Sequence, residues 1–224
     1  ARGCVGLGEA YASGQGTAKD ERRACGLFEK ACGERNVHAC VLYGEMLEMG
    51  KGVTANPAAA AELYRRACDE GSTRGCVNLA RLYADGLGVS RDFNQALQLY
   101  DRACNHGNER GCAHLADFHA RGLGVKKDSA LAARLYTKAC EHDSAHACAG
   151  LGRLYALGEG VTQDYRRAFE LGEHACKAGS QAGCANVAEL YVNGTGVQKD
   201  QTQASALLAK ACESGSTHAC TLLG

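Results

Sequence analysis

Residues 76–104 read CVNLARLYADGLGVSRDFNQALQLYDRAC, and this stretch decides the fold. Apolar residues follow Cys76 at helical spacing, and a second helical stripe runs from Ala96 to Cys104. Between the two stripes, Gly86 is suited to the left-handed conformation that ends a helix, and Asp92 is suited to capping the start of the next helix. The stretch therefore predicts two short helices joined by a turn.

The same unit recurs along the chain with a step of 36 residues, and 13 of the 14 cysteines follow this step. The cysteines form two ladders: Cys4, Cys40, Cys76, Cys112, Cys148, Cys184 and Cys220, and Cys32, Cys68, Cys104, Cys140, Cys176 and Cys212. A fixed period of this length is typical of a solenoid, in which each repeat packs on its neighbours. We predict one all-α solenoid of about 13 helices. Its six repeats are 4–39, 40–75, 76–111, 112–147, 148–183 and 184–219, followed by a stub of a seventh at 220–224.

A Gly-x-Gly pair stands between the two predicted helices of every repeat, as in Gly86 and Gly88. Phosphate-binding loops also contain such pairs, but they follow a strand in a βαβ unit, and no strand precedes these glycines. We interpret the pairs as turns.

The composition restricts the partners of the chain. Lys and Arg together number 25, as do Asp and Glu, so the formal net charge is zero. A nucleic acid or an anionic membrane surface requires a basic face, which argues against both as the main partner. No apolar run reaches the length of a membrane span. We expect a monomer without a cofactor.

The many cysteines indicate either disulfides or metal sites. Pairing each cysteine of the second ladder with the next one of the first predicts a bridge at every joint between repeats, where a tight turn brings helix ends within bonding distance. The predicted bridges are Cys32–Cys40, Cys68–Cys76, Cys104–Cys112, Cys140–Cys148, Cys176–Cys184 and Cys212–Cys220. Zinc is the alternative, but the seven-residue spacing is wrong for the usual knuckle, and two thiolates leave zinc short of ligands. We therefore expect disulfides and no metal.

Two cysteines, Cys4 and Cys25, remain unpaired in this scheme. A Cys4–Cys25 bridge is an alternative, although antiparallel helices would place Cys4 nearer to Ala31. The expected mate of Cys4 would lie before residue 1, and Cys220 begins a repeat that stops at once. We expect the array to be cut at both ends.

Six copies of the pattern Cys76-x-x-Leu79-Ala80, with the glycine pair and the capping Asp92 after it, resemble the Sel-1-like repeat family. The resemblance implies a right-handed superhelix whose concave side, lined by the first helix of each repeat, binds protein or peptide partners. The regular cysteine pairs are similar to those of a disulfide-rich bacterial subset, which implies a periplasmic or secreted protein. This resemblance suggests an immunity protein that neutralises a secreted toxic effector. The alternative that it implies is a β-lactam (penicillin)-binding protein or weak β-lactamase.

Catalytic motifs are missing from the sequence. It lacks Ser-x-x-Lys, Lys-Thr-Gly, Ser-Asp-Asn, Gly-x-Ser-x-Gly and His-Glu-x-x-His. We therefore expect no enzyme. Among the histidines only His114, with Asp117 on the same helical face, is placed to reach a ligand, and the alternative is an ordinary solvated pair.

The expected binding surface consists of residues of the first helices that do not repeat, because solenoids bind partners through such positions. The candidates are Leu42, Glu45, Asn78, Arg81, Asp85, His114, Asp117, Arg121, Arg153, Asn186, Glu189 and Asn193. Their mixed charges favour a partner matched by shape and local charge pairs. The alternative is an ordinary polar helix face.

Overall fold

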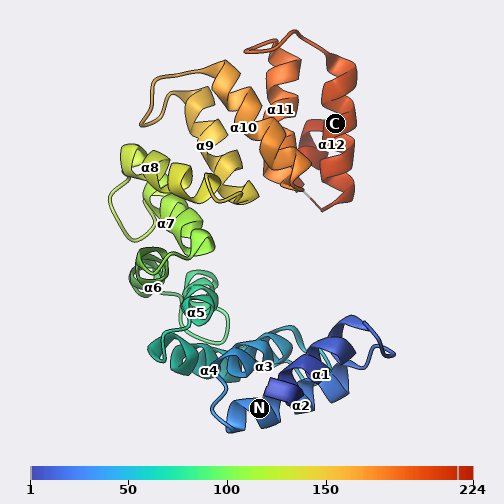
Figure 1. Cartoon of the computed structure of the whole chain (residues 1–224). Coiled ribbons are helices and arrows are strands. Elements are labelled where there is room, and N and C mark those ends of the chain that lie inside the picture. The colour runs from blue at the N-terminus through green and yellow to red at the C-terminus, as the bar shows by residue number, and fades with distance from the viewer. Residues whose placement is uncertain (1, 216, 224) are drawn as a thin grey trace. The chain divides into compact units, whose positions relative to one another are not determined.

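The structure is a computed structural model that describes residues 2–215 and 217–223. In these ranges it contains thirteen α-helices and no strand, which confirms the predicted all-α fold (Figure 1). The helices are α1 (Arg2–Ser13), α2 (Glu21–Gly33), α3 (Val37–Met49), α4 (Pro57–Asp69), α5 (Thr73–Asp85), α6 (Phe93–Asn105), α7 (Glu109–Arg121), α8 (Ser129–Cys140), α9 (Ala145–Leu157), α10 (Tyr165–Lys177), α11 (Gln181–Asn193), α12 (Gln201–Glu213) and α13 (Thr217–Leu223).

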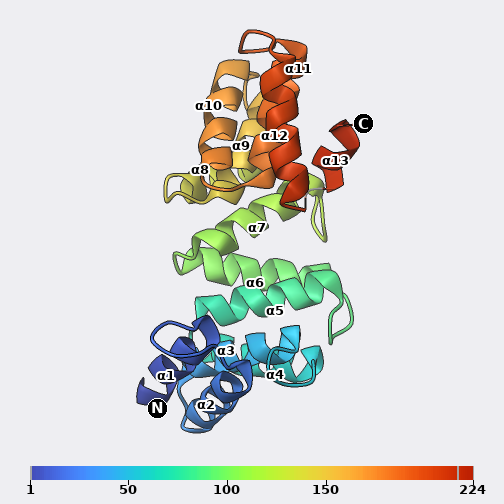
Figure 2. The same cartoon turned by 90° about the vertical axis from the view of Figure 1, so that its right-hand side faces the viewer.

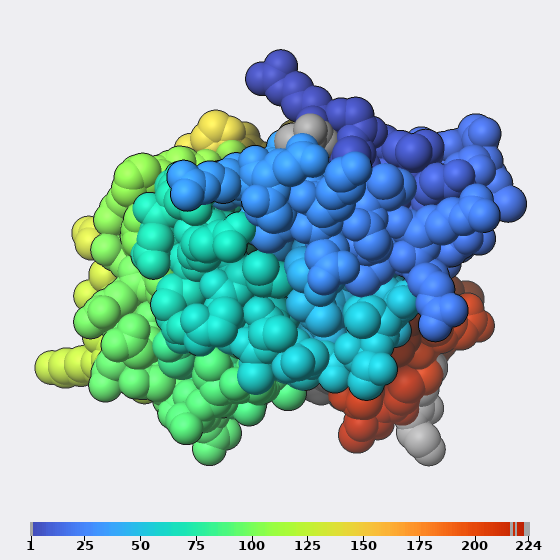
Figure 3. Space-filling model, turned by 90° about the horizontal axis from the view of Figure 1, so that it is seen from below, coloured from blue at the N-terminus to red at the C-terminus, as the bar shows by residue number. Residues whose placement is uncertain are grey.

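The chain divides into two compact units, Ala1–Gly111 and Cys112–Gly224. In the first unit each helix from α1 to α6 packs on the next, and in the second unit the helices from α8 to α13 do the same (Figures 1 and 2). Helix α11 also contacts α9 and α13, so the first helices of successive repeats stack on one another. Figure 3 shows the resulting close-packed surface of the first unit in blue and teal.

The helix ends follow the predicted signals. Every residue of the Asp/Asn column caps its helix by accepting a backbone N–H; these residues are Asp20, Asn56, Asp92, Asp128, Asp164 and Asp200. The first glycine of the pair takes the left-handed conformation after α3, α5, α9 and α11, with φ between 67° and 72°. Local backbone requirements therefore set the helix lengths in each repeat.

The second glycine of the pair packs against the preceding repeat. A Cβ on Gly88 would lie 2.3 Å from the carbonyl carbon of Pro57, at the start of α4. The corresponding Cβ on Gly160 would lie 2.2 Å from the carbonyl carbon of Ser129, at the start of α8. The interpretation of both glycines as turn residues was therefore incomplete, because the second one also permits close contact between repeats.

Alanines and aromatic side chains form the core of each unit. The alanine four residues after the capping position is at most 1% exposed in every repeat; the column is Ala24, Ala60, Ala96, Ala132, Ala168 and Ala204. In the first unit Tyr64 is fully buried in a cluster with Val41, Leu79 and Leu82. Small and large side chains thus alternate where the helices meet.

Disulfides join the second helix of one repeat to the first helix of the next. The structure joins Cys32 to Cys40, Cys68 to Cys76, Cys140 to Cys148, Cys176 to Cys184 and Cys212 to Cys220, with Cα atoms 4.5–4.8 Å apart. Cys104 and Cys112 are disulfide-bonded as well.

Cys4 and Cys25 are free thiols. Cys4 is half-buried and packs against a cluster that contains Ala31 and Cys32, as the antiparallel arrangement of α1 and α2 predicts. Cys25 lies in the core, where burial raises the pKa of its thiol.

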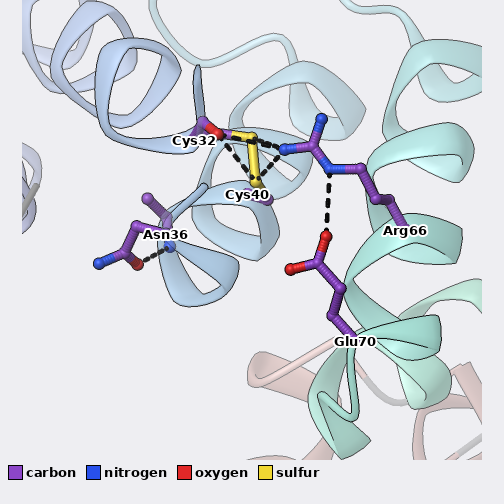
Figure 4. The surroundings of a disulfide bond; sticks show 6 residues. Cys32, Asn36, Cys40, Arg66 and Glu70 are labelled. Carbon is purple, nitrogen blue, oxygen red and sulfur yellow. Dashed lines mark hydrogen bonds and ion pairs between the residues drawn. A yellow bond between two sulfur atoms is a disulfide. The ribbon is translucent and has the colours of Figure 1, made fainter. Parts of the chain in front are cut away.

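An arginine of α4, Arg66, covers the Cys32–Cys40 bridge (Figure 4). Arg66 Nη2 donates to the Cys32 carbonyl oxygen at 3.1 Å and lies 2.9 Å from Cys40 Sγ. Glu70, one helical turn after Arg66, lies 3.8 Å from the same guanidinium. The sequence pattern does not reveal this role of Arg66, since it lies 34 residues from Cys32 and 26 from Cys40 along the chain.

Two residues of the loops that follow the second helices have a strained backbone. Most repeats have a glycine there, such as Gly71 with φ of 93°, whereas Arg35 has φ of 61° and Asp143 has φ of 59°. We expect Arg35→Gly to raise the free energy of unfolding by about 0.5–1 kcal/mol. Removal of roughly 1–2 kcal/mol of strain is partly offset by the greater backbone entropy of glycine. The corresponding rise in Tm, about 2–3 °C, is measured by thermal denaturation.

Asp143→Gly is the matched comparison for this prediction. We expect a smaller gain, because aspartate tolerates the left-handed conformation better than arginine does. Destabilisation by Arg35→Gly would contradict the account.

Candidate partner-binding grooves

The first helices of the repeats line a groove in the first unit, which we call the first-unit groove. It is a hollow of about 560 Å³ between α1 and α3. Two predicted residues, Leu42 and Glu45, line it together with Glu9, Phe28 and Met49. Met49 is 54% exposed, although it is a large apolar side chain. Lys19 and Lys51 line it as well, so the groove combines accessible apolar surface with acidic and basic groups.

The second unit has two adjoining hollows on its first helices, which together we call the second-unit groove. One has a volume of about 270 Å³, and the other of about 310 Å³. Both are lined by Arg153 and Asn186. The predicted residues Glu189 and Asn193 also line the smaller hollow, and Asp117 and Arg121 also line the larger one. Six of the predicted residues thus line one continuous surface.

Some predicted residues of the first unit are engaged in contacts between repeats. Asn78 is only 7% exposed and donates to Glu45 Oε1 at 3.1 Å. The buried amide of Asn78 is thus satisfied within the fold, and its contact with a partner stays a prediction. Arg81 bonds Glu48 and lies 3.8 Å from the exposed Asp85.

A pair of charged or polar groups recurs between the first helices of consecutive repeats. His38 Nε2 lies 3.4 Å from Glu9, Arg74 Nη2 donates to Glu45 at 2.7 Å, and His146 Nε2 lies 2.7 Å from Asp117. Each pair spans 29 residues. In the sequence, the basic residue stands two positions before a cysteine of the first ladder. Its acidic partner stands five positions after the preceding cysteine of the same ladder. The residues predicted from the sequence include Glu45 and Asp117 of these pairs but none of their basic partners.

Asp117 is the most engaged carboxylate of the second-unit groove. Its Oδ1 accepts a hydrogen bond from Tyr136 at 2.5 Å, and its Oδ2 lies 3.4 Å from His114 Nδ1. Burial by itself would raise the pKa of Asp117, but the hydrogen bonds from His114, His146 and Tyr136 outweigh it and hold that pKa well below its usual range. Burial and the negative charge of Asp117 raise the pKa of Tyr136. The predicted pair of His114 and Asp117 is therefore part of a larger cluster.

None of the described helices is long and apolar enough to cross a membrane. Within the described residues, the groups that suit a metal are His114, Asp117 and His146, which are considered below.

Comparison with known families gives one match that covers nearly the whole chain. The family model of the Sel1 repeat matches residues 1–34, 37–72, 73–108, 110–144, 145–180 and 181–216. No curated protein matches the sequence.

Solved structures with the same fold come from several bacteria. A Sel1 repeat protein from Oxalobacter formigenes is 26% identical, with a TM-score of 0.86 over 94% of this chain and 84% of that one. A protective antigen with an SLR fold, present in uropathogenic Escherichia coli strains, is 28% identical, with a TM-score of 0.79 over 99% of this chain and 48% of that one. The chain thus spans about half the length of the antigen. An immunity protein from Pseudomonas aeruginosa is 17% identical, with a TM-score of 0.64 over 95% of this chain and 81% of that one, and is similar in fold alone.

Proposed function

Because the chain belongs to the Sel1 repeat family, whose repeats form protein-interaction scaffolds, we propose that it binds a protein partner through its first-unit and second-unit grooves. The proposal rests on one observation: exposed apolar side chains lie beside charged side chains in the grooves. Leu157 is 53% exposed in the second-unit groove, beside Arg153 and Glu189. An exposed apolar side chain surrounded by charged groups is typical of a protein interface, with an apolar centre and a polar rim.

The chemistry of the grooves favours a partner of mixed charge. The second-unit groove contains the cations Arg121 and Arg153 and the anions Asp117 and Glu189. The first-unit groove contains the anions Glu9, Glu21 and Glu45 and the cations Lys19 and Lys51. With a net charge of zero, the chain attracts no partner by bulk charge, so specificity rests on local pairs within the grooves.

We propose further that the partner is a secreted toxic effector and that the chain acts as its immunity protein. The shared fold with an immunity protein from Pseudomonas aeruginosa supports this proposal. The disulfides support a periplasmic or secreted location, because such bonds persist in oxidising compartments. In this role the protein acts as a monomer without catalysis.

Site-specific photo-crosslinking tests the proposed groove. A photoreactive amino acid replaces Leu157 in the groove or, as a control, Arg166 on α10, whose side chain is 85% exposed. We expect the Leu157 probe to crosslink one discrete protein in periplasmic or secreted extract and the Arg166 probe to crosslink none. Equal labelling from both positions, or no labelling from Leu157, contradicts the proposal.

Nitrocefin hydrolysis tests the alternative β-lactam function. We expect no turnover by the purified oxidised protein, since the sequence has no serine β-lactamase motif.

A further inference from the structure

A cluster of metal-ligating side chains lies in the second unit. His114 and Asp117 come from α7 and His146 from α9, and their ligand atoms all lie within 4.8 Å of one another. His146 Nε2 is 2.7 Å from Asp117 Oδ2, and His114 Nδ1 is 3.4 Å from the same oxygen. Two imidazoles from different helices therefore converge on one carboxylate oxygen.

We propose that His114, Asp117 and His146 bind a divalent transition-metal ion, with zinc as the first candidate. Imidazole nitrogen and carboxylate oxygen bind zinc at about 2.0–2.2 Å, which places the ligand atoms of a tetrahedral site roughly 3.4 Å apart. The three side chains need only small adjustments to surround an ion at this spacing. Three protein ligands leave one coordination position for water or another group. This proposal replaces the expectation from the sequence that the chain binds no metal.

The carboxylate of Asp117 is held in the orientation that such a site requires. Tyr136 is 4% exposed and donates to Oδ1, which leaves Oδ2 directed at the two histidines. Gly150 makes room for the tyrosine, because a Cβ there would lie 2.6 Å from Tyr136 Cζ. Partners behind the ligands hold them in place in the same way in known metal sites. Tyr136 is therefore a positioning residue for the proposed ligand Asp117.

The first unit contains the same arrangement without the metal ligands. Two repeats earlier, Glu45 stands in the place of Asp117, and Arg74 stands in the place of His146 and donates to that glutamate. Leu42 stands in the place of His114. Arginine is always protonated and cannot ligate a cation, so the first unit has a salt bridge at this position. The replacement of both residues by histidine in the second unit is what a metal site requires.

The surroundings of the cluster admit a further ligand. Asp117 and His146 line the larger hollow of the second-unit groove, so solvent reaches this place. Arg121 and Arg153 line the same hollow, and their charges favour an anionic group, such as a carboxylate, beside the ion.

Isothermal titration calorimetry with zinc chloride alone tests the proposal. The oxidised protein is freed of metal with EDTA and carries Cys4→Ser, because Cys4 is a partly exposed free thiol that can also bind zinc. We expect one zinc ion per chain. Cobalt(II) in place of zinc gives the visible absorption of a site with nitrogen and oxygen ligands.

The decisive variant is His146→Arg, because Arg74 shows that the fold accepts arginine at the corresponding place. We expect this variant to keep its circular dichroism spectrum and to lose at least 100-fold in zinc affinity, since loss of an outer-shell partner alone lowers metal affinity about 10–100-fold. His114→Ala is expected to have a similar effect, and Tyr136→Phe to weaken binding about tenfold.

His38→Arg is the matched control. His38 pairs with Glu9 in the first unit, where Gly6 stands in place of the second histidine, so zinc affinity is expected to stay unchanged. No zinc binding up to millimolar concentration, or equal affinity of the His146→Arg variant and its parent, overturns the proposal. No partner protein is present in these titrations, so their outcome is separate from the proposed partner binding.

Discussion

Reduction of the disulfides is expected to unfold most of the chain at physiological temperature. Each bridge closes a loop of only a few residues between two helices, with a sequence separation of 8. In the chain-entropy model such a loop stabilises the fold by roughly 2.5 kcal/mol. The three bridges described within the second unit, Cys140–Cys148, Cys176–Cys184 and Cys212–Cys220, then contribute about 7.5 kcal/mol, a large part of the 5–15 kcal/mol that stabilises an ordinary domain.

Thermal denaturation followed by circular dichroism, with and without a phosphine reductant, measures this effect. We expect a cooperative transition in the oxidised protein and the loss of most helical signal at 37 °C after reduction. Alkylation of Cys4 in the oxidised protein is the control, since this thiol is free, and it should leave the transition unchanged. A reduced protein that melts within a few degrees of the oxidised one would show that helix packing alone holds the repeats together.

Replacement of Gly88 by alanine is expected to lower the free energy of unfolding by about 3 kcal/mol or more. The new Cβ would lie 2.3 Å from the Pro57 carbonyl carbon and 2.4 Å from the Ala58 nitrogen, and both are backbone atoms that cannot move aside freely. The φ of 69° adds strain for any residue with a side chain. The Tm should fall by roughly 6–12 °C in thermal denaturation.

Gly16→Ala separates the two causes of this loss. Gly16 has a similar φ of 72°, but a Cβ there would meet nothing within 4 Å. We expect a loss of about 1–2 kcal/mol, from backbone strain alone. Equal losses at Gly88 and Gly16 would mean that the second glycine serves only the turn and has no part in packing between repeats.

The sequence predicts the fold well because the repeat makes each structural requirement visible several times. The capping residue Asp92, the terminal glycine Gly86 and the buried Ala96 each recur in a column, and each acts within its own repeat. Requirements of this kind depend on residues close together in the chain. They can therefore be inferred without knowledge of the tertiary structure.

Contacts between repeats are harder to predict, because the residues that make them change from one repeat to the next. The same position holds Arg74 in one repeat and His146 in another, and the acid it meets lies 29 residues earlier. Asp117 and Arg153 occupy positions that do not repeat, and both line the second-unit groove. Asn78 also occupies a position that does not repeat, yet it is buried against Glu45, because periodicity does not distinguish a buried contact between repeats from an exposed side chain.

The central claim is that the non-repeating residues of the first helices bind a protein partner. Calorimetric titration of the crosslinked partner, once purified, into two charge-reversal variants tests it most directly. Arg153→Glu changes a residue shared by both hollows of the second-unit groove, and Arg166→Glu makes the same change in net charge on α10. We expect Kd to rise at least 100-fold for Arg153→Glu, because reversal of a charge at an interface costs about 3 kcal/mol or more, and to stay within about threefold for Arg166→Glu. Unchanged affinity of the Arg153→Glu variant, or an equal loss in both, would contradict the claim.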